Sequence, residues 1–257
     1  MPPLLHATRS GRGGRVVLVH GFTQSAASWA RLAGELAANH EVLAVDLPGH
    51  GRSFVPGPGW DLSRSARALG ESAGRGAYVG YSLGARTCLH LALEAPALVE
   101  RLVVVGAHPG IVDPDERAAR RRADESRAAA LEAGGDDAVD RFLDEWLAGP
   151  LFAHLSAEQA DRPARGGNTA AGLAASLRSD GAGAQEPLWE RLGELEMPVL
   201  VVAGARDDKF VPIARATAEA IGPNASLLLM ADAGHAACFE QPVAFAAALR
   251  AFLAAGA

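Results

Sequence analysis

Six short runs of apolar residues recur along the chain, each bounded by residues that favour turns. Within a run the hydrophobicity is continuous rather than alternating, which predicts strands buried on both faces, as in a parallel sheet covered by helices. The runs are Val16–His20, Val42–Asp46, Ala77–Tyr81, Leu102–Gly106, Val199–Ala203 and Leu227–Met230. Leu4–Thr8 is a further candidate for an edge strand.

Segments with helical character lie between these runs and include Ala26–Asn39, Leu83–Ala95 and Ile213–Ile221. The alternation of strands and helices predicts a doubly wound α/β architecture. In such a sheet, ligands bind outside the carboxyl ends of the strands. We therefore look for candidate chemistry where each predicted strand ends.

The alternation stops between residues 109 and 192, where no run predicts a strand and alanine, arginine and acidic residues dominate. This segment predicts several inserted helices, with Gly134-Gly135 and Gly166-Gly167 as turns between them. We expect an α/β core of residues 1–108 and 193–257, with residues 109–192 as a helical cap over the strand ends. A second helical domain with no part in the site is the alternative.

Composition narrows the class of protein. The 257 residues, of which 49% are hydrophobic, suffice for one α/β domain with an insertion. A formal net charge of −6 argues against general nucleic-acid binding, which needs a basic face to neutralise phosphates. Two cysteines, Cys88 and Cys238, are too few for a disulfide framework and favour a reducing compartment. No run resembles a signal peptide or a membrane span, so we expect a cytoplasmic protein with no membrane partner. We also expect it to be a monomer.

The pentapeptide Gly80-Tyr81-Ser82-Leu83-Gly84 follows a predicted strand and precedes a predicted helix, the context that a nucleophile elbow requires. A serine on such a tight, strained turn needs small residues on both sides so that neighbouring backbone segments can approach. The helix that starts at Leu83 also directs its N-terminal dipole at negative charge that develops near the serine. Ser82 is therefore the candidate nucleophile.

Two backbone amides are candidates for an oxyanion hole. His20-Gly21-Phe22 ends a predicted strand, and in this architecture the residue after His-Gly supplies one N–H group. The residue after the nucleophile supplies the other, so we assign these roles to Phe22 and Leu83. We interpret His20 as a structural histidine that braces the loop.

Asp207 follows one late predicted strand and His235 follows the next. An imidazole can accept the serine proton, and a buried carboxylate can fix its tautomer and stabilise the imidazolium. The chain order Ser82, Asp207, His235 is the one expected with this elbow. Among eight histidines, the place just before Phe239-Glu240-Gln241-Pro242 selects His235.

Two other aspartates compete for the acid role. Asp208 is adjacent to Asp207 but would point differently, and Asp46 lies too early in the chain. Asp46 opens the glycine-rich turn Asp46–Ser53, which we interpret as scaffold because its glycines permit conformations closed to other residues. Together with the elbow, this turn closely resembles the pattern of the α/β-hydrolase superfamily. The resemblance implies an α/β-hydrolase fold: a mostly parallel central sheet flanked by helices, with an inserted helical cap.

Five further stretches resemble one branch of that superfamily, the 2-succinyl-6-hydroxy-2,4-cyclohexadiene-1-carboxylate synthases of menaquinone biosynthesis. They occur in the family's order, and several lie in the insertion, where generic hydrolases diverge most. They are Gly80–Arg86; Gly106–Gly110 with the arginine-rich segment Arg120–Asp124; Trp146 with Pro150–Phe152; Arg165–Thr169; and Arg206–Phe210. Ala85 departs from the family's usual glycine, a small change that leaves the elbow intact.

This resemblance implies elimination of pyruvate from a small polycarboxylate, 2-succinyl-5-enolpyruvyl-6-hydroxy-3-cyclohexene-1-carboxylate. Arg86, Arg120 and Arg165 match the family's substrate-binding arginines, and guanidinium forks bind carboxylates in a bidentate way. Arg86 also lies one helical turn from Ser82 on an otherwise apolar predicted helix.

Further pocket positions carry alternatives of their own. Tyr81, Trp146 and Lys209 match the family's pocket, although Trp146 suits core packing and Lys209 suits a surface charge. The insertion also holds a crowd of arginines, and for any one of them a solvated charge paired with a neighbour is the alternative. These arginines are Arg117, Arg120, Arg121, Arg122 and Arg127.

In the predicted mechanism, His235 and Asp207 raise the basicity of Ser82, which removes a proton from the substrate ring so that pyruvate departs. No metal or organic cofactor is expected, since no cluster has metal-ligand spacing. Two alternatives stay open. A carboxylesterase or carbon–carbon bond hydrolase would use the same three residues with Ser82 as nucleophile. A non-catalytic binding protein of this fold would not need all three residues.

Overall fold

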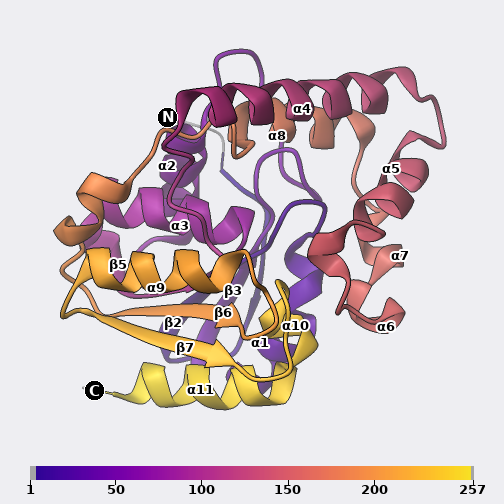
Figure 1. The fold of residues 1–257 in the computed structure, drawn as a ribbon. Coiled ribbons are helices and arrows are strands. Elements are labelled where there is room, and N and C mark those ends of the chain that lie inside the picture. Colours follow the sequence, from indigo (N-terminus) through magenta and orange to yellow (C-terminus); the bar gives the residue numbers. More distant parts are fainter. Residues whose placement is uncertain (1–3, 256–257) are drawn as a thin grey trace.

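The computed structural model describes residues 4–255, and its centre is a seven-stranded sheet (Figure 1). The strands are β1 (Ala7–Ser10), β2 (Gly14–Val19), β3 (His40–Val45), β4 (Gly76–Tyr81), β5 (Val99–Val105), β6 (Val199–Gly204) and β7 (Ala225–Met230). Their order is β1-β3-β2-β4-β5-β6-β7, and each neighbouring pair is parallel except β1 and β3. The predicted, mostly parallel sheet is confirmed.

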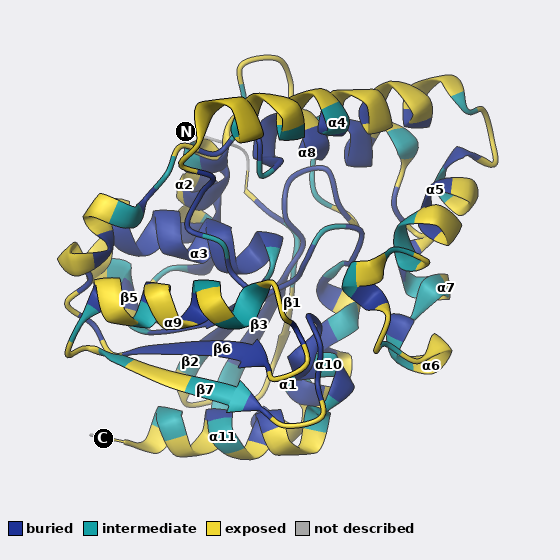
Figure 2. Ribbon diagram, in the orientation of Figure 1, coloured by how far each residue is buried: buried dark blue, intermediate teal, exposed yellow. Residues whose placement is uncertain are grey.

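Both faces of the sheet are buried, because the side chains of the strands alternate between two cores. In β2, Val17 and Val19 join the first core, while Val16 and Leu18 join the second. The first core is covered by α2 (Leu62–Ala73), α3 (Leu83–Glu94) and α9 (Phe210–Ile221), and the second by α1 (Ala30–Leu36) and α11 (Pro242–Ala254). Burial on both faces explains why the inner strands, such as β2, β4 and β6, are continuous apolar runs, whereas the edge strands β1 and β7 are much less buried (Figure 2).

All six apolar runs fall on strands, with small differences at their ends. The edge strand expected at Leu4–Thr8 lies instead at Ala7–Ser10, where the ladder starts with Ala7 opposite Val45. Leu4 is exposed, and Leu5 is buried with its N–H bonded to the Ser72 hydroxyl (2.8 Å) rather than to a strand. Leu5 therefore anchors the chain to α2.

Helix boundaries differ more from the prediction. The segment expected as one helix over Ala26–Asn39 is a short 3-10 helix, Ala26–Trp29, followed by α1. Helix α1 ends at Leu36 because the chain must turn into β3. Helix α9 begins three residues before the expected Ile213, since Pro212 is tolerated within the first turn of a helix. Helices α2 and α11 were not among the predicted segments.

The segment between β5 and β6 is helical, as predicted. It contains α4 (Pro114–Ala133), α5 (Ala138–Leu147), α6 (Ala157–Ala160), α7 (Arg162–Arg165) and α8 (Ala170–Asp180). Helices α4 and α8 pack side by side, and α5, α6 and α7 lie beyond the arrowheads of β6 and β7 in Figure 1. These helices share a small core that includes Leu131, Phe142 and Leu173. Arg178 of α8 strengthens the pair by bonding to Glu125 and Glu132 of α4.

The turn between β4 and α3 depends on backbone contacts that only glycine permits. A Cβ on Gly80 would lie 2.5 Å from the carbonyl oxygen of Gly84. A Cβ on Gly84 would lie 2.6 Å from the carbonyl oxygen of His20 and closer still to that of Val19. The start of α3 therefore packs directly on the end of β2, which brings Ser82 next to the loop that follows β2.

We expect Gly84→Ala to destabilise the protein by at least about 2 kcal/mol, because the added methyl group meets rigid backbone rather than a side chain that can move. Gly34→Ala in α1 is the matched control, since no atom lies within 4 Å of its Cβ position. That change should stabilise by roughly 0.5–1 kcal/mol. Urea unfolding followed by circular dichroism measures both, and equal stability of the two variants would contradict the packing argument.

Candidate active site

Ser82 stands at the turn between β4 and α3 with a backbone φ of +50°. Residues other than glycine rarely adopt this region, so the conformation is strained and is held by its surroundings. The Ser82 N–H donates to the carbonyl of Val105 at the end of β5 (2.8 Å), and its carbonyl accepts from the N–H of Arg86 (3.1 Å). Ser82 therefore lies where two central strands end, in the conformation expected of an elbow.

Three side chains that are distant in sequence meet at this turn. The Ser82 Oγ lies 3.3 Å from Nε2 of His235, and Nδ1 of His235 lies 3.1 Å from Oδ2 of Asp207. In this geometry the Nδ1–H donates to the carboxylate, and Nε2 is left to accept the serine proton. Burial opposes ionisation of Asp207, but its hydrogen bond and attraction to His235 hold its pKa below the usual value. The arrangement suits proton removal from the serine.

The two rival aspartates lie elsewhere. Asp208 is exposed. Asp46 is buried, and its carboxylate accepts from the N–H groups of Ala26 (2.6 Å) and Arg52 (3.0 Å) and contacts Nδ1 of His6 (2.9 Å). Asp46 therefore holds its turn together, which confirms the scaffold interpretation.

The loop that carries Phe22, here called the oxyanion loop (residues 20–24), is held from behind by His20. The Nδ1–H of His20 donates to the Gly21 carbonyl (2.8 Å), and its Nε2 accepts from the N–H of Leu47 (3.0 Å). Burial lowers the pKa of His20 to about 4, so the ring stays neutral with one nitrogen free to accept. The predicted bracing role of His20 is confirmed.

A second buried histidine, His50, holds the same loop and was not predicted to do so. Its Nδ1–H donates to the Pro48 carbonyl (3.1 Å), and its Nε2 accepts from the N–H of Thr23 (3.2 Å). Burial and the neighbouring His20 lower the pKa of His50 to about 3. In the sequence, the only sign of this role is that His50 lies inside the glycine-rich turn Asp46–Ser53. From the sequence, we interpret that turn as scaffold and assign no separate role to its histidine.

Two residues of the insertion are bonded to the oxyanion loop. Asn168 donates from Nδ2 to the Thr23 carbonyl (2.6 Å) and accepts at Oδ1 from the N–H of Gly51 (2.8 Å). Arg165 donates from Nη1 to the Thr23 hydroxyl (2.5 Å) and to the Phe22 carbonyl (3.5 Å). Both side chains are buried. Asn168 lies in a stretch that sequence reasoning noted, but nothing in the stretch indicated this bridging contact.

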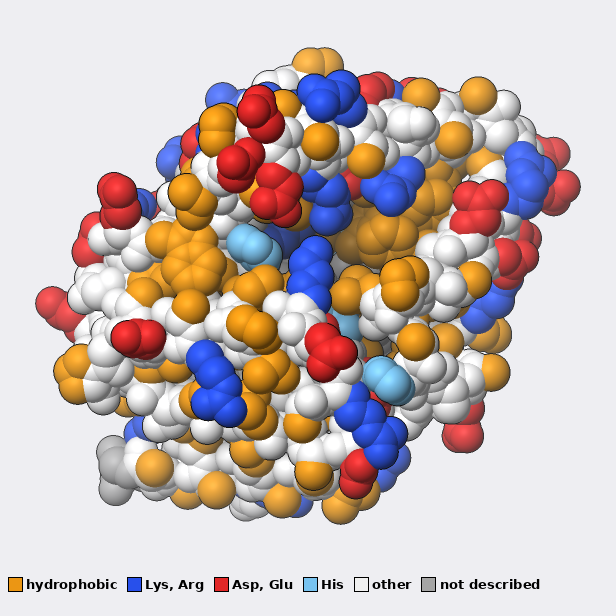
Figure 3. Space-filling view, viewed as in Figure 1, with side chains coloured by type: hydrophobic (Ala, Val, Ile, Leu, Met, Phe, Trp, Pro, Cys, Tyr) orange, Lys and Arg blue, Asp and Glu red, His pale blue; other side chains and the backbone are white. Residues whose placement is uncertain are grey.

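A cavity of about 130 Å³ opens beside Ser82, here called the serine pocket. Phe22 and Leu83, the two predicted oxyanion residues, both line it, as does His235. Figure 3 shows a hollow on this face with hydrophobic side chains inside and Lys and Arg side chains at its edge. The reactive side chains and the predicted oxyanion residues thus border the same space.

Arg86 is buried in the wall of the serine pocket, with 9% of its surface exposed. Its Nη1 donates to the side-chain oxygen of Gln185 (3.1 Å), and among residues 4–255 no carboxylate pairs with it. Burial and the like charge of Arg120 lower the pKa of Arg86 to about 10, which still leaves it charged at neutral pH. A buried cation without a carboxylate partner favours an anion in the pocket.

Arg120, Trp146 and Lys209, three of the predicted substrate-binding residues, also line the serine pocket. The Nε of Arg120 bonds to both carboxylate oxygens of Asp124 (2.9 Å each), so part of its charge is already neutralised. Trp146 stacks on Phe142 with ring centroids 5.8 Å apart. Trp146 therefore serves the core of the insertion and the pocket together.

Tyr81 and Arg165, by contrast, are not part of the pocket lining. The Tyr81 ring is buried, and its centroid lies 5.5 Å from that of the His235 ring. Burial raises the pKa of the Tyr81 hydroxyl. The Arg165 guanidinium is occupied by the Ala160 carbonyl (2.6 Å) and by the oxyanion loop. In this structure Arg165 supports the loop and does not face the pocket, because backbone and hydroxyl oxygens already accept its N–H groups.

Sequence reasoning missed Asp180, which ends α8 and lines the serine pocket together with Arg86. Its two carboxylate oxygens accept from the Ser65 hydroxyl (3.1 Å each), and burial raises its pKa to about 7. The charge of the pocket therefore changes near neutral pH. No local pattern could indicate this, since Ser65 is 115 positions away in the chain.

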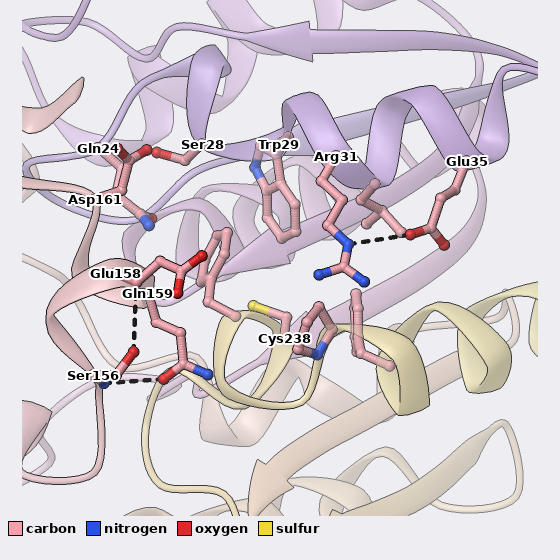
Figure 4. A pocket seen from close by; sticks show the side chains of 14 residues that line it. Gln24, Ser28, Trp29, Arg31, Glu35, Ser156, Glu158, Gln159, Asp161 and Cys238 are labelled. Atoms are coloured by element: carbon pink, nitrogen blue, oxygen red, sulfur yellow. Dashed lines mark hydrogen bonds and ion pairs between the residues drawn. The ribbon is translucent and has the colours of Figure 1, made fainter. Parts of the chain in front are cut away.

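A second cavity of about 380 Å³ lies between α1, α6 and the short helix α10 (Ala237–Glu240), as Figure 4 shows. Trp29, Phe239 and Phe245 form its apolar side, and Glu158 and Asp161 lie on its polar side. It shares no lining residue with the serine pocket.

Two negative findings concern the described part of the chain. Within residues 4–255, no three side chains of His, Cys, Asp or Glu are grouped so that they could hold a metal ion. No helix in this range is both long and apolar enough to cross a membrane.

Comparison with known proteins places the chain among relatives. Residues 14–242 match the family described as alpha/beta hydrolase fold. The 2-succinyl-6-hydroxy-2,4-cyclohexadiene-1-carboxylate synthase of Serratia proteamaculans (strain 568) is 31% identical over 245 residues, covering 93% of this chain and 92% of that protein. Protein PHYLLO, chloroplastic, of Arabidopsis thaliana is 29% identical over 95% of this chain, which spans 16% of that protein. The structure of MenH from S. aureus superposes with a TM-score of 0.89 at 28% identity, covering 96% of this chain and 97% of that one.

The two neutral histidines predict a loss of stability in acid. The unfolded chain binds protons at both residues below about pH 6.5, whereas the folded state stays neutral down to the lowered pKa values of about 4 for His20 and about 3 for His50. Their contribution is therefore complete above pH 6.5 and is lost as the pH falls, at up to about 1.4 kcal/mol per pH unit for each residue.

His50→Gln keeps an oxygen that can accept from the N–H of Thr23. The change should remove about half of the slope of the unfolding free energy against pH. His154→Gln, at an exposed histidine, is the control and should leave the slope unchanged. Urea unfolding between pH 4.5 and 7.5 measures the slopes. An unchanged slope in His50→Gln would contradict the neutral state of His50.

Proposed function

The chain belongs to the α/β-hydrolase fold family and, within it, to the 2-succinyl-6-hydroxy-2,4-cyclohexadiene-1-carboxylate synthases, and from this premise we propose that it eliminates pyruvate from 2-succinyl-5-enolpyruvyl-6-hydroxy-3-cyclohexene-1-carboxylate. The protein is an enzyme of the α/β-hydrolase type, and its family serves menaquinone biosynthesis. One observation carries the proposal: Arg86, a buried cation that forms no salt bridge with any carboxylate of residues 4–255, lies in the same pocket as Ser82 and His235.

In the proposed mechanism Ser82 acts as a base. His235 accepts the serine proton at Nε2, and Asp207 stabilises the resulting imidazolium. The serine oxygen removes a proton from the ring carbon next to the succinyl carbonyl, the ring double bond shifts, and the carbon–oxygen bond to the enolpyruvyl group breaks. The departing enolpyruvate regains a proton and becomes pyruvate, so the reaction consumes no water and needs no cofactor.

Negative charge develops on the succinyl carbonyl oxygen as the proton leaves. The backbone N–H groups of Phe22 and Leu83 are proposed to stabilise this oxygen. Leu83 is the first residue of α3, so its N–H is free of helix bonds and lies at the positive end of the helix dipole. Phe22 is held in place through the contacts of Arg165, His20 and His50 with its loop.

The carboxylates of the substrate are proposed to bind at the cationic side of the serine pocket. Arg86, Arg120 and Lys209 line this side, and within residues 4–255 no carboxylate forms a salt bridge with Arg86. We propose that residues 109–192 act as a cap that delivers Arg120 and excludes water. The substrate class is thus a small polycarboxylate.

A carboxylesterase or carbon–carbon bond hydrolase is the alternative. The contacts among Ser82, His235 and Asp207 would serve acyl transfer equally well, and the fold hosts both chemistries. A neutral ester, however, gains nothing from a buried arginine, whose desolvation costs free energy unless an anion compensates it. Arg86 therefore favours the polycarboxylate reaction.

The decisive assay supplies the proposed precursor and follows pyruvate with lactate dehydrogenase, alongside p-nitrophenyl acetate hydrolysis. We expect rapid pyruvate release and slow ester cleavage, because the pocket stabilises an anionic substrate. Ser82→Ala should abolish pyruvate release. Fast ester cleavage without pyruvate would instead identify a hydrolase.

Arg86→Ala should lower kcat/KM for pyruvate release by roughly 10- to 150-fold, the equivalent of about 1.5–3 kcal/mol for hydrogen bonds to a charged group. Turnover of the neutral ester should change less than about threefold, since it has no carboxylate to bind. Arg122→Ala, at an exposed arginine of α4, is the matched control and should change neither pyruvate release nor ester hydrolysis. Equal losses for both substrates would mean that Arg86 only supports the fold.

A further inference from the structure

Glu240 ends the short helix α10, five residues after His235, and its carboxylate points back to that histidine's loop. One carboxylate oxygen accepts from the N–H of Gly234 (2.6 Å) and the other from the N–H of Ala236 (2.9 Å). Glu240 is buried, with 8% of its surface exposed. A single side chain thus bonds to the backbone on both sides of His235.

The backbone N–H groups of Gly234 and Ala236 require a hydrogen-bond acceptor from a side chain. They lie between β7 and α10, where neither a strand ladder nor a helix supplies an acceptor, and a buried N–H without an acceptor is costly. An ionised carboxylate is the side chain that can accept two such bonds at once. The two hydrogen bonds fix the backbone of His235 and therefore the point from which its imidazole side chain extends.

Helix α10 also contacts the insertion. The Glu240 carbonyl accepts from Nε2 of Gln159 in α6 (3.0 Å). Phe239 and Cys238 line the second cavity, which Figure 4 shows between α10 and α6. Glu240 is therefore joined to the inserted helices through its backbone and to the histidine loop through its carboxylate.

We propose that Glu240 is a positioning residue that holds His235 in reach of Ser82. The inference rests on the proposed role of His235 as the proton acceptor, but it is independent of whether the reaction is pyruvate elimination or ester hydrolysis. The margin for displacement is small, since the Ser82–His235 contact is 3.3 Å. A shift of the histidine backbone by about 1 Å can cost on the order of a hundredfold in rate.

Glutamine cannot replace Glu240 in this role. Its single amide oxygen can accept from one of the two N–H groups, while its NH₂ group would face the other as donor against donor. Glu240→Gln should therefore loosen the loop although it preserves the volume of the side chain. Glu240→Asp keeps both oxygens but is one methylene shorter, so it should retain part of the effect.

The first test needs no substrate. In ¹⁵N-histidine-labelled protein, the Nδ1–H of His235 should give a resonance that is absent in His235→Gln. Glu240→Gln should shift, broaden or abolish this resonance while the resonances of His20 and His50 stay in place. Glu158→Gln, at an exposed glutamate of the second cavity, is the matched control and should leave all of them unchanged.

The second test measures pyruvate release and p-nitrophenyl acetate hydrolysis at a temperature where circular dichroism shows each variant folded. Glu240→Gln should lower kcat at least about tenfold for whichever substrate wild type turns over, with KM within about threefold. Glu240→Asp should fall between wild type and Glu240→Gln, and it replaces Glu240→Gln in both tests if that variant does not fold.

A folded Glu240 variant with wild-type kcat and an unchanged His235 resonance would overturn the inference. If the wild-type protein releases no pyruvate, the proposed function is refuted. The His235 resonance and the rate of ester hydrolysis would then still decide the role of Glu240.

Discussion

The direct contact between the start of α3 and the end of β2 is the constraint on which the candidate site depends. Because Gly84 has no side chain, the backbone of α3 reaches the carbonyl groups of Val19 and His20. This contact brings Leu83 to the same pocket as Phe22 in the oxyanion loop. The strained backbone of Ser82 persists because α3 and β5 hold it on both sides.

Around that contact, loops rather than strands carry the functional groups, and their amides have no ladder to join. Buried side chains supply the acceptors instead: His50 for Thr23, Asp46 for Ala26, and Glu240 for Gly234. Each acceptor must keep one protonation state to do so. The rigidity of the site therefore rests on buried side chains that accept backbone N–H groups, and burial keeps one of them, His50, in its neutral form.

The serine pocket combines this rigidity with a buried arginine that forms no salt bridge within residues 4–255, although the carboxyl groups of Asp180 and Asp124 lie close enough to attract it. Arg86 is buried without a carboxylate partner among the described residues, while Arg120 is paired with Asp124 and Asp180 changes charge near neutral pH. The resulting balance favours a bound anion but depends on pH. The same three-residue contact at Ser82 could serve hydrolysis or elimination, so the charges in the wall distinguish the proposed reaction from its alternatives.

The sequence by itself determined six of the seven strands, the elbow, and the order of Ser82, Asp207 and His235, because buried strands are continuous apolar runs and functional residues lie at the carboxyl ends of parallel strands. The helix boundaries and the residues that brace the loops were decided only by the tertiary structure. Arg86 and Arg165 are both buried arginines, and both match the family's substrate-binding positions in the sequence. In the structure, however, Arg86 lines the pocket and Arg165 bonds to the oxyanion loop. The reason is physical: whether a donor is free depends on acceptors that folding brings from distant segments, and no local pattern encodes them.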